Sequence, residues 1–213
     1  MSLDPFWSRD GLTIYCGDCA DVLPLLPKSD LLCTDPPYGI GINKSGRLSV
    51  SRGRGGERWD DAPPTQKLLA AAVGSANDAV VWGGNYFGLP PCRGFMVWDK
   101  QNDGRDFGDC EYAWTTLDAV PRIYRDRPQN MDEGRFHTTQ KPVGLMKWCL
   151  MAFGGIATVI DPFMGSGSTL IAARDLGINA VGVEVSEHYC NVAVRRLSQM
   201  VLPLTREAHD VGQ

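Results

Sequence analysis

Residues 157–169 read ATVIDPFMGSGST, and this stretch decides the fold class. Its first four residues are typical of a buried strand, and its glycine-rich end runs into a helical pattern that begins at Thr169. Such a turn lets the backbone approach a ligand closely, and it directs the N–H groups of the following helix toward that ligand. The stretch therefore predicts a strand–turn–helix unit of an α/β protein, with a binding site at the turn.

Short β-rich runs alternate with helical patterns along the rest of the chain, which favours a largely parallel sheet. Seven strands are expected, over residues 13–17, 30–34, 79–82, 94–98, 112–116, 157–160 and 180–185. Four helices are expected, over residues 65–73, 139–153, 169–176 and 187–200. Thr139 and Ser186 are the expected N-caps of the second and fourth helices, and Gly177 follows the third. We predict a single domain, residues 1–213, with a mixed, mostly parallel seven-stranded sheet and helices on both faces.

The composition is that of an ordinary globular protein. The 213 residues suffice for a sizeable core, and 43% of them are hydrophobic. The net charge of −4 argues against a protein that coats nucleic acid by bulk charge, although it is compatible with a local basic groove. No apolar run approaches the roughly 20 residues of a membrane span, and the N-terminus lacks the pattern of a secretory signal. We therefore expect a cytoplasmic protein without a membrane partner.

The cysteines and histidines indicate neither a disulfide framework nor a metal site. Most of the seven cysteines lie in apolar runs, where cysteine acts as a small hydrophobic residue. Cys16 and Cys19 form a C-x-x-C pair, but a zinc site needs a second pair of ligands. The three histidines, His137, His188 and His209, lie far apart in the sequence. We expect reduced, structural cysteines and no bound metal.

Residues 41–58 form a glycine- and serine-rich segment with a strong positive charge. Glu57 is its only acidic residue. Its basic residues are Lys44, Arg47, Arg52, Arg54 and Arg58. The segment is expected to be a mobile basic loop, which either is solvated without a partner or contacts nucleic acid.

Residues 30–39 read DLLCTDPPYG, a buried strand that runs into a stiff polar turn. At the carboxyl end of a strand in an open α/β sheet, such a turn faces the crevice where ligands bind. Pro36 and Pro37 fix φ at two successive positions, which holds the Pro36 carbonyl beside the Asp35 carboxylate. Two neighbouring acceptors suit an –NH₂ group, and Tyr38 offers a flat face for a base. A rigid turn without chemistry is the alternative interpretation.

The amine of adenine or cytosine is a poor nucleophile, because its lone pair is delocalised into the ring. Accepting both N–H bonds at Asp35 and Pro36 would localise that lone pair on the nitrogen. The turn would then hold the amine in line with a methyl donor, and the carboxylate would stabilise the charge that develops on it.

Thr34 to Gly39 resemble the catalytic motif of the DNA amino-methyltransferases. Because this motif precedes the glycine-rich turn, the chain resembles the permuted β group. Residues 82–87, 95–100 and 107–114 together resemble small phage-type DNA adenine methylases. The resemblance spans most of residues 12–200. It implies a Rossmann-like methyltransferase fold, S-adenosylmethionine as cofactor and double-stranded DNA as partner. In this family Asp at position 35 points to the N6 amine of adenine, and the N4 amine of cytosine is the alternative.

The glycine-rich turn resembles the family's D-P-F-x-G-S-G-[ST]-T pattern. A phosphate-binding P-loop would need Lys where Ser168 stands, and a dinucleotide fingerprint would need a small residue where Leu170 stands. Glu184, about 20 residues on, takes the place of a ribose-binding carboxylate, with a surface or capping acid as the alternative. The resemblance adds residues from the HTTQKP segment, in which Thr138 replaces the usual Pro, and from the end of the first strand. The expected cofactor-binding residues are Asp18, Cys19, Asp35, His137, Gln140, Lys141, Asp161, Pro162, Phe163, Gly165, Ser166, Gly167, Ser168, Thr169 and Glu184.

Recognition of DNA is assigned to two basic segments. Larger members of the family carry a separate recognition domain, whereas residues 117–136, with Arg122 and Arg125, leave room only for a short loop. This loop and residues 41–58 are expected to contact DNA, and a homodimer is the alternative source of contacts. A methylase of RNA or protein, or a non-catalytic subunit that binds cofactor or DNA, is the rival interpretation.

Overall fold

The computed structural model describes residues 3–40, 62–102, 108–127 and 140–199. The whole of the expected basic loop, residues 41–58, lies outside these ranges, as do His137 and Thr139. None of the helices in the described ranges combines the length and the apolar character that crossing a lipid bilayer requires.

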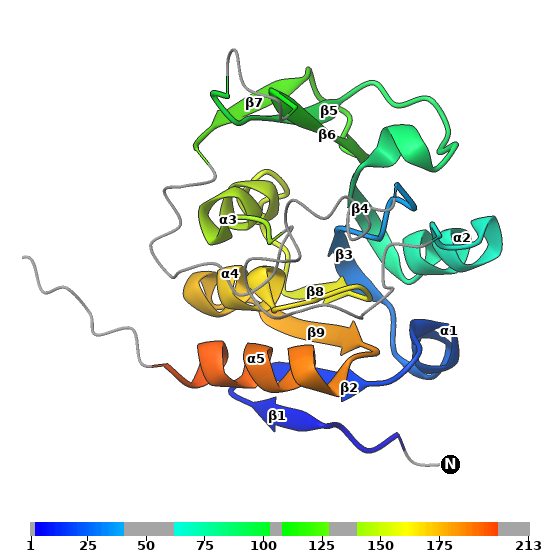
Figure 1. The fold of residues 1–213 in the computed structure, drawn as a ribbon, viewed down its shortest axis with the longest axis vertical. Helices are drawn as coiled ribbons and strands as arrows, with labels where there is room; N and C mark the ends of the chain where they lie inside the picture. Colours follow the sequence, from blue (N-terminus) through cyan, green and yellow to red (C-terminus); the bar gives the residue numbers. More distant parts are fainter. Residues whose placement is uncertain (1–2, 41–61, 103–107, 128–139, 200–213) are drawn as a thin grey trace, which may run out of the picture.

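A single sheet runs through the molecule, with five parallel and three antiparallel neighbouring pairs (Figure 1). Its strands, in spatial order, are β1 (Trp7–Arg9), β2 (Leu12–Cys16), β9 (Asn179–Glu184), β8 (Thr158–Asp161), β3 (Ser29–Thr34), β4 (Ala76–Trp82), β6 (Cys110–Thr115), β5 (Phe95–Asp99) and β7 (Arg122–Arg125). The predicted mixed, mostly parallel sheet is confirmed.

The predicted number of seven strands is wrong, because the sheet has nine. The two additional strands, β1 and β7, are its edges and have only three and four residues. Most of their side chains are exposed, so they lack the apolar alternation from which strands are predicted. Arg122 and Arg125, expected in a loop, lie on β7, which pairs in parallel with β5.

Helices cover both faces of the sheet, as predicted (Figure 1). One face carries α3 (Val143–Met151), α4 (Ser168–Leu176) and α5 (Glu187–Ser198), whose apolar residues form the larger core cluster. The other carries α1 (Cys19–Val22), the 3₁₀ turn η1 (Leu23–Leu25) and α2 (Gln66–Gly74), which form a second cluster. The fold is thus a three-layer α/β sandwich.

The helix ends follow the prediction only in part. Gly177 ends α4 with φ +69°, as expected. Ser186 occupies the N-cap position of α5, but its side chain makes no capping hydrogen bond. The predicted start of α3 near Thr139 is wrong, because α3 begins at Val143, after Pro142. Proline disfavours helical geometry in the residue before it, which delays the helix to this point.

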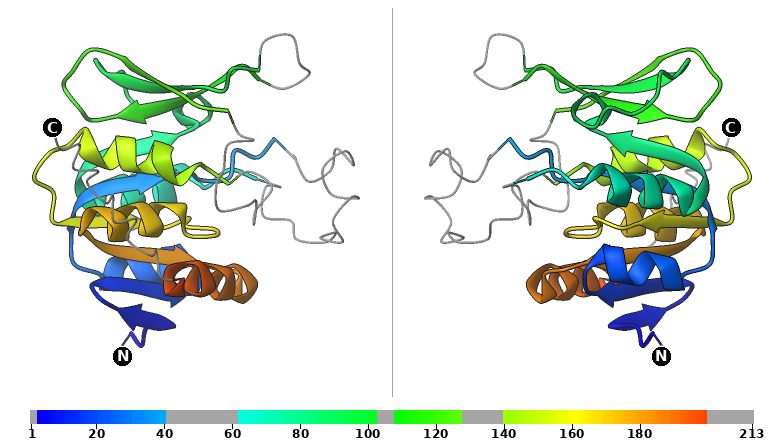
Figure 2. Two further views of the ribbon diagram at one scale, coloured as in Figure 1. Left: turned by 90° about the vertical axis from the view of Figure 1, so that its left-hand side faces the viewer. Right: turned by 90° about the vertical axis from the view of Figure 1, so that its right-hand side faces the viewer.

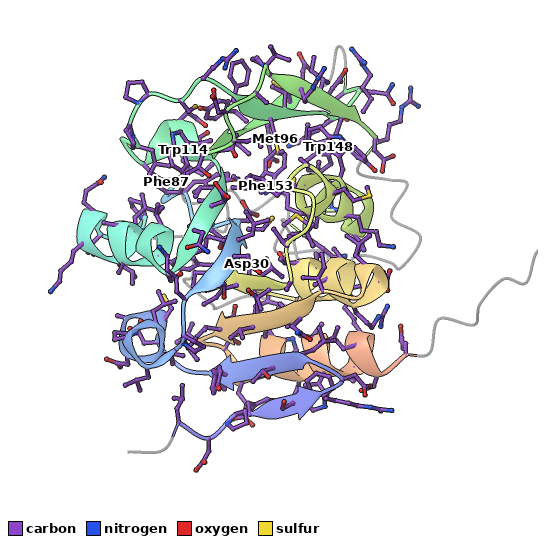
Figure 3. The ribbon with its side chains drawn as sticks, turned by 180° about the vertical axis from the view of Figure 1, so that it is seen from behind. Asp30, Phe87, Met96, Trp114, Trp148 and Phe153 are labelled. Atoms are coloured by element: carbon purple, nitrogen blue, oxygen red, sulfur yellow. The ribbon has the colours of Figure 1, made fainter. Side chains whose placement is uncertain are left out.

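The outer strands pack against α3. Met96 of β5, Trp148 of α3 and Phe153 after it belong to one apolar cluster (Figure 3). The ring centroids of Tyr124 on β7 and Trp148 on α3 lie 5.6 Å apart. Tyr124 is thus the side chain through which β7 packs against α3, and the other three residues of the strand are exposed. The sheet extends from β1 at one end to β5, β6 and β7 at the other (Figure 2).

Strands β3 and β8 lie side by side in parallel at the centre of the sheet, with Leu31 opposite Val159. From β3 the chain passes through α2 to β4 on one side, and from β8 it passes through α4 to β9 on the other. The chain therefore leaves these two strands in opposite directions, which opens a crevice at their carboxyl ends. The two stretches singled out in the sequence, 35–38 and 161–169, follow these strand ends.

Candidate active site

The turn after β3 holds a carboxylate between two donors. Asp35 accepts hydrogen bonds from the Tyr38 hydroxyl at 2.6 Å and from the Lys141 ammonium at 2.5 Å. The Tyr38 ring stacks on that of Tyr86, with centroids 4.9 Å apart. Gly83 has φ +70°, and a Cβ at this position would overlap the Tyr38 ring. The absence of a side chain at Gly83 therefore makes room for the aromatic group of the turn.

Four charged side chains alternate in sign beside this turn. Lys141, only 6% exposed, pairs with Asp35 and lies 2.9 Å from a carboxylate oxygen of Glu111 on β6. The other oxygen of Glu111 pairs with Lys100, just after β5. Lys141 was expected among the cofactor-binding residues, yet its ammonium points to the two carboxylates.

The ion pairs shift the pKa values of these groups. Burial raises the pKa of Asp35 above its ordinary value, while the neighbouring Lys141 charge acts in the opposite direction. Burial would also raise the pKa of Glu111, but Lys141 and Lys100 overcome it and bring that pKa to about 2. Burial alone would lower the pKa of Lys141, and its two carboxylate partners raise it instead. Both Lys141 and Glu111 are therefore charged at neutral pH.

The glycine-rich turn after β8 is tied to the end of β9. Gly165 and Gly167 adopt φ values of +52° and +83°, which favour glycine. The Gly165 N–H donates to one carboxylate oxygen of Glu184 at 3.0 Å, and the Ser186 N–H donates to the other at 2.8 Å. A Cβ on Gly167 would come to 3.0 Å from the Ala193 Cβ, so the turn packs closely on α5.

Asp161 joins the two turns. This carboxylate is 3% exposed and accepts hydrogen bonds from the hydroxyls of Thr34 at 2.7 Å and Thr169 at 2.6 Å. It also accepts the Phe163 N–H at 3.2 Å. Thr34 is the residue before Asp35, and Thr169 lies in the first turn of α4, so one side chain connects the ends of β3 and β8. Burial raises the pKa of Asp161 to about 6, although these hydrogen bonds oppose the shift.

A cleft of about 600 Å³ opens between the two turns, within the size range of small-molecule sites. Residues from both motifs contribute to its wall. The expected site residues that line it are Asp18, Cys19, Asp35, Pro36, Pro37, Tyr38, Gln140, Lys141, Asp161, Pro162, Phe163, Gly165, Ser166, Ser168, Thr169 and Glu184. Of the expected cofactor residues that the structure describes, only Gly167 is not among the lining residues.

Several lining residues were not predicted. They are Gly17, Leu68, Glu111, Met146, Met164, Val185, Ser186 and Tyr189. Glu111 is the single acid in a strand that otherwise carries aromatic and small residues. That pattern marks Glu111 as unusual, but it does not tell which side chains Glu111 contacts. Tyr86 follows a double glycine after β4, and its stacking on Tyr38 depends on the pairing of β4 with β3.

The two described basic candidates for DNA contact lie apart from the cleft. Arg122 and Arg125 are exposed on the edge strand β7 and are not among the lining residues. Arg125 pairs with Asp99 of β5 at 3.2 Å.

Comparisons with known proteins identify the family. Residues 81–195 match the family model of the DNA methylases, which is more than half of the chain. The chain belongs to the DNA methylase family. This DNA methylase is 36% identical to the type II methyltransferase M2.DpnII of Streptococcus pneumoniae, with 91% of this chain and 92% of that protein covered. It is 24% identical to the type II methyltransferase M.ScaI of Streptomyces caespitosus, over 91% and 83% of the two chains.

Solved structures share the fold of this DNA methylase. The M1.HpyAVI–SAM complex superposes with a TM-score of 0.60 at 21% identity, covering 88% of this chain and all of that chain. The cytosine-N4-specific PvuII DNA methyltransferase also gives a TM-score of 0.60, at 14% identity over 93% and 90% of the chains. The expected Rossmann-like methyltransferase fold and the resemblance to DNA amino-methyltransferases are both confirmed.

The cleft of this DNA methylase can hold two reactants side by side. On the β3 side Asp35 and Pro36 line it, and a carboxylate and a backbone carbonyl are both acceptors. On the β8 side a glycine-rich turn leads into the N-terminus of α4, whose N–H groups favour a polar or anionic group. This arrangement suits transfer between a molecule bound at the glycine-rich turn and an amine bound at Asp35.

Proposed function

We propose that this DNA methylase transfers a methyl group from S-adenosylmethionine to the N6 amine of an adenine flipped out of double-stranded DNA. The observation that carries the proposal is that Asp35, Pro36 and the turn 161–169 line one cleft at the adjacent ends of β3 and β8. The membership of the DNA methylase family supports the same reaction.

The residues of the cleft fit the cofactor. Ser168 lies at the first position of α4, and its buried hydroxyl has no hydrogen-bond partner within the described part of the chain. An unpaired buried hydroxyl at a helix N-terminus suits a carboxylate of a ligand. We assign Glu184 to the ribose hydroxyls as a hydrogen-bond acceptor, and Phe163 and Val185 line the same cleft. When bound, the cofactor supplies an electrophilic methyl group.

The chain's own residues then prepare the amine. Asp35 and the Pro36 carbonyl accept its two N–H bonds, which localises the lone pair on nitrogen and stabilises the charge that develops there. Tyr38, held by Asp35 and Tyr86, supplies aromatic surface for the flipped base. The apolar part of the cleft keeps water away from the reacting atoms.

Cytosine is the second candidate base. The PvuII enzyme, which is cytosine-N4-specific, shares the fold of this chain. The exocyclic amines of adenine and cytosine present the same two N–H donors, so the same acceptors could serve either. Asp35 in the first position of the motif is the feature that favours adenine.

We further propose that DNA is contacted by Arg122, Arg125 and the basic residues of 41–58, and that the enzyme works in the cytoplasm. Arginine and lysine at these positions would contact phosphates or guanine edges. A homodimer would add contacts that the short interval 117–136 does not provide.

Incubation of the purified protein with duplex DNA and radiolabelled S-adenosylmethionine tests the function. Digestion of the product to nucleosides should yield labelled N6-methyladenine. Labelled N4-methylcytosine would select the second candidate. Label in RNA or protein but not in DNA, or no transfer at all, would reject the proposal.

A further inference from the structure

We propose that Lys141 is a positioning residue for the Asp35 carboxylate rather than a ligand of the cofactor. This inference rests on the proposed function, because it assumes that Asp35 binds the amine of the base. It deepens that function by assigning Lys141 to the base side of the cleft.

The Lys141 ammonium donates hydrogen bonds to Asp35 and Tyr38 and forms an ion pair with Glu111. Its nitrogen lies 2.5 Å from Asp35, 2.9 Å from Glu111 and 3.2 Å from the Tyr38 hydroxyl oxygen. An ammonium has three N–H donors, and here three oxygens surround it. The side chain is 5% exposed. A cofactor group would have to enter among these three oxygens to reach the buried Lys141 ammonium.

Lys141 and the three oxygens around it come from three separate parts of the chain. Asp35 and Tyr38 follow β3, Glu111 lies on β6, and Lys141 itself precedes α3. The ammonium also lies 5.7 Å from the ring centroid of Trp82, at the end of β4. Contacts from several directions fix the position of the Lys141 ammonium. The ammonium in turn fixes the Asp35 oxygen to which it donates.

The charge of Lys141 matters for what Asp35 can accept. A protonated carboxyl group would present a donor on one oxygen, and that oxygen could then not accept an amine N–H. Burial raises the pKa of Asp35, and the nearby acid Glu111 also disfavours the carboxylate. The Tyr38 hydroxyl and Lys141 favour it, and Lys141 is the cation in contact with Asp35.

The pH dependence of methylation tests the inference. In Lys141→Met, loss of the contacting cation should move the acidic midpoint of the single-turnover rate to higher pH by about 1–3 units. Lys141→Arg keeps the charge and should leave the midpoint near that of the wild type. The cofactor Kd, measured by calorimetry, should change by less than about threefold in both variants, because the ammonium contacts side chains of the protein and not the cofactor.

Lys147→Met is the matched control. Lys147 pairs with Asp175 between α3 and α4 and does not line the cleft, so neither the midpoint nor the Kd should change. An unchanged midpoint in Lys141→Met, together with a cofactor Kd raised about tenfold or more, would overturn the inference and identify Lys141 as a cofactor ligand.

A thermal unfolding cycle separates this inference from the proposed function, because it needs no DNA. Lys141→Met leaves the buried Asp35 carboxylate without its ammonium, whereas Asp35→Asn with Lys141→Met removes both charges. The single variant should therefore have a lower Tm than the double variant. A double variant as unstable as the single one, or less stable, would reject the coupling. A wild-type protein that fails to methylate DNA would reject the proposed function and leave the result of this cycle intact.

Discussion

Asp35 retains acceptor capacity although two donors already contact it. An ionised carboxylate offers about four lone-pair sites, and the Tyr38 hydroxyl and Lys141 ammonium occupy one on each oxygen. An amine can therefore bind without breaking either contact. The two donors restrict the rotation of the carboxylate, so its remaining lone pairs are directed before the base arrives.

Removal of this carboxylate should abolish the chemistry and spare cofactor binding. We expect Asp35→Ala to lower the single-turnover rate by at least about 10²–10³-fold, the effect of losing one electrostatic contact to a developing charge. The cofactor Kd should stay near that of the wild type. Asp118→Ala, at an exposed site paired with Arg93, is the control. Turnover that survives in Asp35→Ala would reject the proposed mechanism.

The absence of a side chain at Gly83 sets the position of the Tyr38 ring. No motif of the sequence indicates this contact. In Gly83→Ala the new methyl group overlaps the ring, and φ +70° adds strain of roughly 1–2 kcal/mol. We expect the ring to move away from Asp35 and the methylation rate to fall by about tenfold or more, with little change in cofactor affinity.

Gly74→Ala is the matched control for this substitution. Gly74 is the last residue of α2, and a Cβ there would have no neighbour within 4 Å. Rate measurements on both variants decide the matter. Equal rates in Gly83→Ala and the wild type would show that the ring position is unimportant for the reaction.

Strands β3 and β8 are joined by side chains at both ends. At the amino end, Asp30 of β3 accepts the N–H groups of Ala157 and Thr158, at 2.8 and 2.9 Å (Figure 3 labels Asp30). At the carboxyl end, Asp161 of β8 accepts the hydroxyl of Thr34. These two carboxylates set the register of the two strands that carry the site, and the second one lies within the cleft wall.

The burial of Asp161 should make stability depend on pH. Asp161 has a pKa of about 6 in the folded protein, against an ordinary value of 3.8. The folded state therefore holds this proton more tightly than the unfolded state, and its contribution to stability is lost as the pH rises through about 6. Relative to Asp161→Asn, the free energy of unfolding of the wild type should fall by about 2 kcal/mol between pH 4 and 7. Urea unfolding of both proteins measures this, and parallel pH profiles would contradict it.

At the scale of the whole molecule, the cleft lies where the two halves of the sheet meet. The half with β2, β8 and β9 carries the glycine-rich turn, and the half with β3, β4, β5, β6 and β7 carries the catalytic turn. Helices on opposite faces connect the strands of each half. A ligand in the cleft contacts both halves, so its binding should stabilise the entire fold.

S-adenosylmethionine at a free concentration about 100-fold above its Kd should stabilise the folded protein by about 2.7 kcal/mol and raise Tm by roughly 5–10 °C. Glu184→Ala should show a smaller rise at the same concentration, because the carboxylate that holds Gly165 and faces the cleft is lost. Glu187→Ala, at an exposed position in the first turn of α5, should show the wild-type rise. An equal rise in both variants would argue against the role of Glu184 in cofactor binding.

The sequence by itself determined the central part of the fold. The seven inner strands were located within a few residues, because apolar runs of β-branched residues bounded by turn residues are a local signal. The two proline and glycine turns at 35–38 and 161–169 were recognisable for the same reason, since their backbone requirements belong to consecutive residues. The edge strands β1 and β7 carry no such signal and were missed.

Only the tertiary structure decided which side chains meet. Lys141 contacts Asp35 across 106 positions of the chain, and Asp161 contacts Thr34 across 127. Glu111 reaches the same cluster from β6, and Gly83 faces Tyr38 because β4 pairs with β3. Electrostatic and packing interactions act through space over a few ångströms, so their partners depend on strand order and register. Local sequence patterns do not encode that order, and it is the order β8-β3-β4-β6 that assembles the charged cluster beside the proposed base site.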